Sequence, residues 1–150
     1  MIRVQRQDFD IGTEIDALTR GRSDVGAIVS FTGVVRADTE ADPLKSMTLE
    51  HFPGMTEREL QRVEAEARVR WQLLDAAIIH RVGELLPGDR IVLVVAVSQH
   101  RSDAFEAASF LMDYLKTQAP FWKRELRLSG EHWVEPRDSD ESAAARWQNG

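Results

Sequence analysis

Ile91 to Val97 form an unbroken apolar run, IVLVVAV, composed mostly of β-branched residues. A strand that packs one face on a core and shows the other to water alternates apolar and polar residues, and this run does not alternate. It is also far shorter than the ~20 apolar residues of a membrane-spanning helix. The run therefore predicts a strand in the interior of a sheet, with both of its faces covered.

The rest of the chain alternates between strand and helix patterns without an internal repeat. Strands are expected at 2–4, at 25–36, at 46–52, between Ala76 and the turn at Pro87, at 121–128 and at 132–136, and helices at 11–18, 55–71 and 102–118. Turns such as Pro87–Asp89 resemble hairpin connections more than regular crossovers. The pattern predicts an α+β fold with a mixed, largely antiparallel sheet and flanking helices, in a single domain spanning residues 1–150.

Several local signals mark the ends of these elements. Thr56 and Glu59 suit a capping box at the start of the second helix, and Pro120 ends the third. The acidic stretch 37–45 has little to bury and is expected to be a mobile loop. Residues 138–150 form a polar tail that we expect to fray or to cover a neighbouring element.

Composition excludes several classes of protein. The 19 basic and 25 acidic residues give a net charge of −6, which argues against binding to nucleic acid or to an anionic membrane surface. There is no cysteine, so any sulfur chemistry must use sulfur from elsewhere. The four histidines are too scattered for a metal site. The N-terminus lacks the apolar run of a signal peptide, which predicts a cytoplasmic protein.

Two lysines lie in an unusually apolar segment, YLKTQAPFWKRE. On a helical wheel Lys116 falls at the border of an apolar stripe made of Phe105, Ala108, Met112 and Leu115. Lys123 follows the Ala-Pro break and shares a strand face with Phe121. Lys116 could snorkel to solvent and Lys123 could be a solvated edge-strand charge. Alternatively, both could line a cavity.

Three further basic residues occur at the ends of strands. His100 and Arg101 lie where a buried strand turns into a helix N-terminus, a place that favours anions. Arg36 ends the first long strand. Taken singly, such residues are more often structural. If they share a pocket with the lysines, the cations would hold an anionic substrate and a lysine could transfer a proton or act as a nucleophile.

The motifs FTGVVR, LEHFPGMTE, HRVGELLPGD, SQHRSDAFEA and MDYLKTQAPFWKRE resemble, in order and spacing, the catalytic large subunit of molybdopterin synthase. The resemblance extends from about Val25 to Arg137. It implies an α/β hammerhead fold and a sulfurtransferase of molybdenum cofactor biosynthesis that converts precursor Z, a cyclic pyranopterin monophosphate, into molybdopterin. No cofactor or metal of its own is implied.

The resemblance also implies partners and a source of sulfur. The sulfur would come from a thiocarboxylate on the C-terminal Gly-Gly of a small ubiquitin-like carrier subunit, whose tail enters the active site. The chain would form a central homodimer with one carrier at each end, making a heterotetramer. The alternative is a non-catalytic binding module for a ubiquitin-like tail or an anionic pterin, in which the lysines act only as charges.

Site residues are implied position by position. Lys116 and Lys123 match the two catalytic lysines, which also contact substrate. The other expected substrate-binding residues are Val34, Val35, Arg36, His100, Arg101, Arg124, Glu125 and Arg137, the last reaching a neighbouring subunit's site. Two departures affect this site: the loop 37–42, ADTEAD, is acidic and lacks glycine, and Pro136 stiffens the approach to Arg137.

Overall fold

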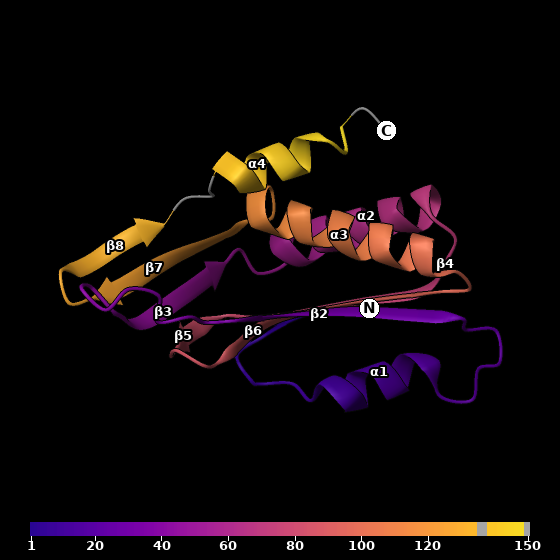
Figure 1. Cartoon of the computed structure of the whole chain (residues 1–150), viewed down its shortest axis with the longest axis horizontal. Coiled ribbons are helices and arrows are strands. Elements are labelled where there is room, and N and C mark those ends of the chain that lie inside the picture. Colours follow the sequence, from indigo (N-terminus) through magenta and orange to yellow (C-terminus); the bar gives the residue numbers. More distant parts are fainter. Residues whose placement is uncertain (135–137, 149–150) are drawn as a thin grey trace.

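Two four-stranded sheets and four helices make up the part of the chain that the computed structural model describes, residues 1–134 and 138–148 (Figure 1). The first sheet has the order β1-β4-β6-β2, with β1 Ile2–Gln5, β4 Leu73–Arg81, β6 Arg90–Ser98 and β2 Ala27–Val34. The second has the order β5-β3-β7-β8, with β5 Gly83–Leu85, β3 Leu44–His51, β7 Phe121–Arg127 and β8 Gly130–Val134. Only β1 and β4 pair in parallel among these strands. The predicted α+β class and largely antiparallel pairing are confirmed.

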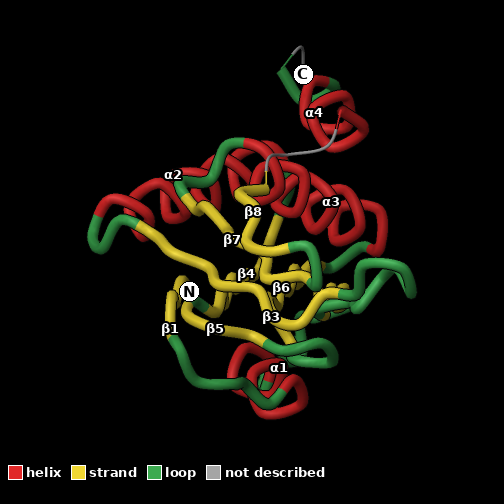
Figure 2. The backbone as a smooth tube through the Cα atoms, turned by 90° about the vertical axis from the view of Figure 1, so that its left-hand side faces the viewer, coloured by secondary structure: helices red, strands yellow, loops and turns green. Residues whose placement is uncertain are grey.

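Helices cover both faces of the first sheet. The helices are α1 Ile11–Thr19, α2 Met55–Arg70, α3 Arg101–Thr117 and α4 Asp138–Ala145. Helices α2 and α3 lie on one face and α1 lies on the other (Figures 1 and 2). None of the helices in the described residues is long and apolar enough to cross a membrane.

This layering explains the apolar run in β6. Strand β6 lies between β4 and β2, and its side chains alternate between two cores. Val92 and Val94 pack into the core under α2 and α3. Leu93, Val95 and Val97 pack into the core above α1. From Val92 to Ser98 every residue of the strand is buried, so the prediction of an interior strand is confirmed.

The second sheet continues from one end of the first (Figure 1). Strand β3 begins at Leu44, so the last two residues of the predicted loop belong to a strand. The three-residue strand β5 was not predicted, because a segment this short has no recognisable periodicity. Strand β7 pairs with β3 on one side and β8 on the other. The pairing with β8 confirms the expectation that the segment 132–136 pairs back, although β8 spans Gly130–Val134 and residues 135–136 lie outside the described residues.

The apolar stripe predicted on α3 is partly wrong. Ala104, Ala107 and Leu111 are fully buried, whereas the side chain of Phe105 is 61% exposed. A helical wheel gives angles between residues and not the direction of the core, and here small alanines face the sheet. Met112 remains half-buried, toward the C-terminal end of the helix.

The polar tail is partly structured. Helix α4 lies on the outer side of α3 (Figure 2). After it, the indole of Trp147 packs edge-on against Trp71 and Phe110, with ring centroids 5.5 and 5.7 Å away, and its Nε1 donates a 2.7 Å hydrogen bond to Asp113. This segment therefore covers a neighbouring helix, one of the two outcomes expected for it.

Candidate active site

A cavity of about 550 Å³ opens between the second sheet, the end of β2 and the C-terminal part of α3. Both lysines of the YLKTQAPFWKRE segment line it. Of the predicted site residues, it brings together Val34, Val35, Arg36, Lys116, Lys123 and Glu125. The chain contains only three lysines, and the third, Lys45, is exposed and is not among the lining residues.

The lysines reach the cavity from different elements. Lys116 lies in the last turn of α3, beside Met112 and Leu115, which also line the cavity. Lys123 lies on β7, on the same strand face as Phe121 and Glu125, and all three line the cavity. The expectation that Lys123 shares a face with Phe121 fits this arrangement. A single apolar-walled space thus receives two ammonium groups.

Thr56 ties the segment between these lysines to α2. Its hydroxyl accepts a 3.0 Å hydrogen bond from the Phe52 N–H and donates a 3.0 Å hydrogen bond to the carbonyl of Pro120. The predicted capping box is therefore wrong: the helix cap is Gly54, whose N–H donates to Glu57. Thr56 is fully buried and binds the residue that immediately precedes β7.

Arg127 fixes the acidic loop beside Arg36. Its guanidinium donates two 2.8 Å hydrogen bonds to the carboxylate of Asp38 and one of 2.8 Å to Glu125. These bonds hold the pKa of Asp38 far below its ordinary value. Both carboxylates line the cavity and both are paired with the same arginine. The mobility of the loop stays a prediction.

His100 and Arg101 lie away from this cavity. Both are exposed at the N-terminal end of α3, and 15 residues separate Arg101 from Lys116. At 1.5 Å per residue, this places their Cα atoms ~22 Å apart. Within one chain, the lysines and the His100-Arg101 pair therefore do not share a pocket. The shared pocket that the sequence suggested is wrong for a single chain.

Among the described residues, Arg124 is also absent from the cavity lining. Arg124 pairs with Glu50 and Glu131 and stacks over Trp133, on the opposite face of β7 from Lys123. Arg137 lies outside the described residues.

His80 lines the cavity but was not predicted as a site residue. Its ring is buried and stacks on Phe121, with centroids 3.9 Å apart. Burial lowers the pKa of the imidazole to about 4, and the nearby positive charge of Lys116 acts in the same direction. The sequence did contain a signal for His80, because a histidine within the apolar segment AAIIHR is unusual. From the sequence we considered this histidine only as a metal ligand.

The site has a definite chemical character. Arg36, Lys116 and Lys123 supply positive charge, and Val35, Leu49 and Phe121 supply apolar walls. The two carboxylates in the described lining are already paired with Arg127. The cavity thus suits a small anionic ligand and gives it a lysine for proton transfer.

Fold and cavity together define an α+β protein with a lysine-based anion site. Residues 4–118 match the family described as "MoaE protein". The chain is 55% identical over 150 residues to the molybdopterin synthase catalytic subunit of Mesorhizobium japonicum, covering 99% of this chain and 93% of that one. The chain belongs to the MoaE family.

Solved structures agree with this assignment. The molybdopterin biosynthesis MoaE protein of Burkholderia ambifaria superposes with a TM-score of 0.84 at 49% identity, over 99% of this chain and 97% of that one. The molybdopterin synthase structure from Staphylococcus aureus has a TM-score of 0.82 at 27% identity, over 88% of this chain and 95% of that one. The family expected from the sequence motifs is confirmed.

Proposed function

We propose that this chain is the catalytic subunit of a molybdopterin synthase. It transfers sulfur from the thiocarboxylate of a small ubiquitin-like carrier to precursor Z and forms the dithiolene of molybdopterin. The reaction takes place in the cytoplasm, and this chain contributes no metal or cofactor of its own. The observation that carries the proposal is the convergence of Lys116 and Lys123 with Arg36 in one cavity.

The cavity fits both halves of this reaction. A phosphate on the pterin needs a cation, which Arg36 supplies at the cavity wall. An extended Gly-Gly tail has no side chains and can enter a narrow, partly apolar space. Because the chain has no cysteine, the sulfur must arrive on the partner.

The chemistry follows from the charges. The thiocarboxylate sulfur attacks a pterin carbon and forms a C–S bond, while a lysine ammonium donates a proton to the oxygen that leaves as water. Water then cleaves the bond between the carrier's acyl carbon and sulfur, so that the thiol stays on the pterin and the carrier departs as a carboxylate. A second transfer completes the dithiolene. Lys116 lies nearer the carrier tail and Lys123 faces the pterin in this proposal.

A second copy of the chain accounts for the distant basic residues. If the chain forms a homodimer, His100 and Arg101 of one copy can reach the cavity of the other, and each end of the dimer can bind one carrier. Strand β2 is an edge of the first sheet, and it exposes Ile28, Phe31 and Val34. We name these residues and Phe105 the β2 strip.

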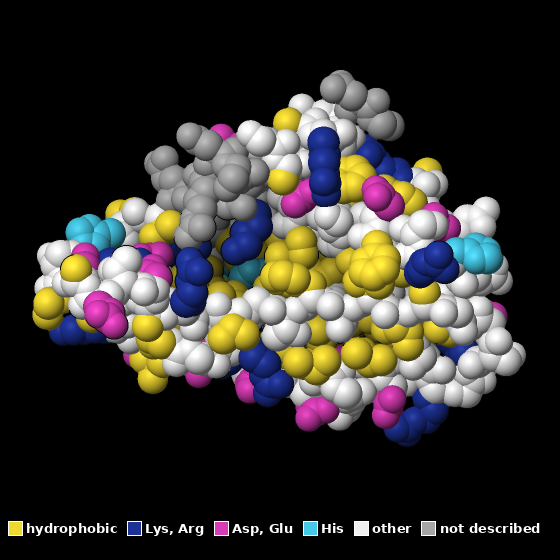
Figure 3. All heavy atoms as spheres, viewed as in Figure 1, with side chains coloured by type: hydrophobic (Ala, Val, Ile, Leu, Met, Phe, Trp, Pro, Cys, Tyr) yellow, Lys and Arg dark blue, Asp and Glu magenta, His cyan; other side chains and the backbone are white. Residues whose placement is uncertain are grey.

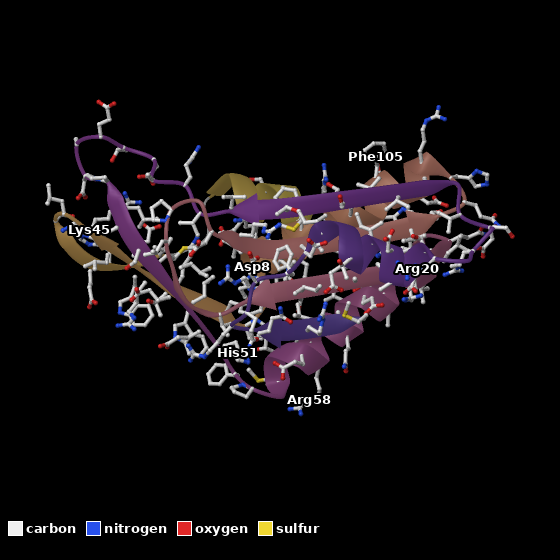
Figure 4. The ribbon with its side chains drawn as sticks, turned by 90° about the horizontal axis from the view of Figure 1, so that it is seen from below. Asp8, Arg20, Lys45, His51, Arg58 and Phe105 are labelled. Atoms are coloured by element: carbon white, nitrogen blue, oxygen red, sulfur yellow. The ribbon has the colours of Figure 1, made fainter. Side chains whose placement is uncertain are left out.

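The β2 strip has the character of an interface. Figure 3 shows apolar side chains gathered over β2 and α3 on one face, and Figure 4 shows Phe105 extending past β2. An unpaired, apolar edge strand exposed to water is a site for association between chains. Because the strip runs toward the end of β2 that lines the cavity, its pairing would bring a second copy close to the lysines.

Lysine-to-arginine variants test the assignment of the lysines. Lys116→Arg and Lys123→Arg keep the positive charge, but an arginine does not give up its proton near neutral pH. We expect each to lower sulfur transfer by ~100-fold or more while the carrier still binds. Lys45→Arg is the matched control and should remain fully active. Full activity of both cavity variants would instead support a binding module in which the lysines act only as charges.

A further inference from the structure

His80 is a buried titratable residue with no part in the reaction described above. It lies near the end of β4, opposite Val92 of β6, and its ring faces the cavity. One face of the ring is stacked on Phe121, with an angle of 18° between the two planes. Since Phe121 and Lys123 share a strand face, the imidazole is fixed relative to the element that supplies Lys123.

The hydrogen bond of one ring nitrogen defines the tautomer. Nδ1 of His80 lies 2.8 Å from the carbonyl oxygen of Arg81. A carbonyl oxygen can only accept, so Nδ1 carries the hydrogen and donates it. In the neutral ring, the remaining lone pair is then on Nε2. His80 is therefore a hydrogen-bond acceptor with a fixed orientation.

Titratable groups from three elements act on this ring. Lys116 on α3 has the strongest effect of them, followed by His51 on β3 and Lys123 on β7. All three oppose a positive charge on His80, so the ring stays neutral beside the lysines.

We propose that His80 is a positioning residue for Lys116, whose ammonium donates a hydrogen bond to Nε2 of the imidazole when the carrier tail fills the cavity. The inference rests on the proposed function, because only sulfur transfer requires Lys116 to hold a proton at a defined place. In the chain alone Lys116 is exposed, so water can solvate its ammonium. Filling the cavity removes that water, and a buried ammonium without an acceptor is costly.

A neutral acceptor suits this task better than a charged one. A carboxylate beside Lys116 would stabilise the ammonium strongly and oppose transfer of its proton. A protonated histidine would repel it. The imidazole of His80 accepts one hydrogen bond, adds no charge to the cavity and leaves the lysine able to give up its proton.

Two substitutions separate this role from simple packing. His80→Phe keeps a ring that can stack on Phe121 but removes the acceptor, whereas His80→Gln loses the stacking and keeps a carbonyl acceptor near the position of Nε2. We expect His80→Phe to lower kcat by ~10- to 100-fold with little change in carrier affinity, and His80→Gln to recover most of that loss. A packing role predicts the reverse order, and finding that order would overturn the proposal.

The wild-type chain provides a test that does not depend on how the variants fold. Nitrogen-15 NMR of histidine-labelled protein at pH 7 should show His80 as the neutral ring with its hydrogen on Nδ1. A hydrogen on Nε2, or a protonated ring, would refute the proposal even if sulfur transfer is fully active. Conversely, a chain that transfers no sulfur but shows the expected tautomer would refute the proposed function alone.

Discussion

Replacing Thr56 with valine tests how the fold positions β7. The two side chains have nearly the same shape, but valine can neither accept from the Phe52 N–H nor donate to the Pro120 carbonyl, both of which are 3.0 Å from the hydroxyl. Thr56 is fully buried, so both backbone groups lose their partner at a site that water does not readily reach. Each such loss costs about 1–3 kcal/mol.

We therefore expect Thr56→Val to lower the free energy of unfolding by about 2–6 kcal/mol, measured by urea denaturation. For a chain of this size the midpoint of thermal unfolding should fall by ~4–24 °C. Sulfur transfer should fall as well, because Pro120 immediately precedes β7, the strand of Lys123.

Thr56→Ser is the matched control. It keeps the hydroxyl and removes one methyl group, which costs about 1 kcal/mol. The serine variant should be the more stable of the two. If the valine variant unfolds at the same urea concentration as the serine variant, or at a higher one, the hydrogen bonds of Thr56 do not hold β7.

Three other variants test separate parts of the structure. In Gly26→Ala the new Cβ would lie 2.0 Å from a backbone carbonyl oxygen, so urea denaturation should show a free energy of unfolding lower by about 1–3 kcal/mol. In the control Gly12→Ala the new Cβ meets nothing closer than 3.6 Å, so the change should be neutral or stabilising. Phe105→Glu should shift the chain from dimer to monomer in analytical ultracentrifugation, whereas Val69→Glu, on α2, should not. If Phe105→Glu remains a dimer, the β2 strip is not the dimer interface. The pKa of His80 is about 4 in the folded chain and 6.5 ordinarily, so the unfolded chain binds the proton first and stability falls as the pH drops from 6.5 toward 4. Between pH 7.5 and pH 5, the free energy of unfolding of the wild type should fall by about 2 kcal/mol more than that of His80→Phe. An equal fall in both proteins would contradict the lowered pKa.

The sequence predicted those features that depend on local patterns. Ile91–Val97 indicated an interior strand because a strand without a polar face must be covered on both sides. Lys116 and Lys123 stood out because cations are costly beside apolar walls, and the family resemblance assigned their roles. The structure brings these two lysines together with Arg36.

Features that depend on tertiary contacts could not be predicted. The direction in which Phe105 points is set by how α3 packs on the sheet, and the wheel carries no such information. Thr56 showed the pattern of a helix cap, yet its partner Pro120 is 64 residues away. The role of His80 depends on its stacking against Phe121, a residue from the other sheet. Arg101 and Lys116 lie near opposite ends of α3, so the length of this helix keeps them apart. No sequence motif indicates that separation.

The central claim is that this cavity transfers sulfur from a carrier thiocarboxylate to precursor Z. Mass spectrometry of precursor Z, incubated with this chain and a thiocarboxylated carrier, tests it most directly. We expect a product that has gained two sulfur atoms, and no gain of sulfur when the carrier ends in a plain carboxylate. Unchanged precursor Z with the thiocarboxylated carrier, or sulfur gained with the plain carboxylate, would contradict it.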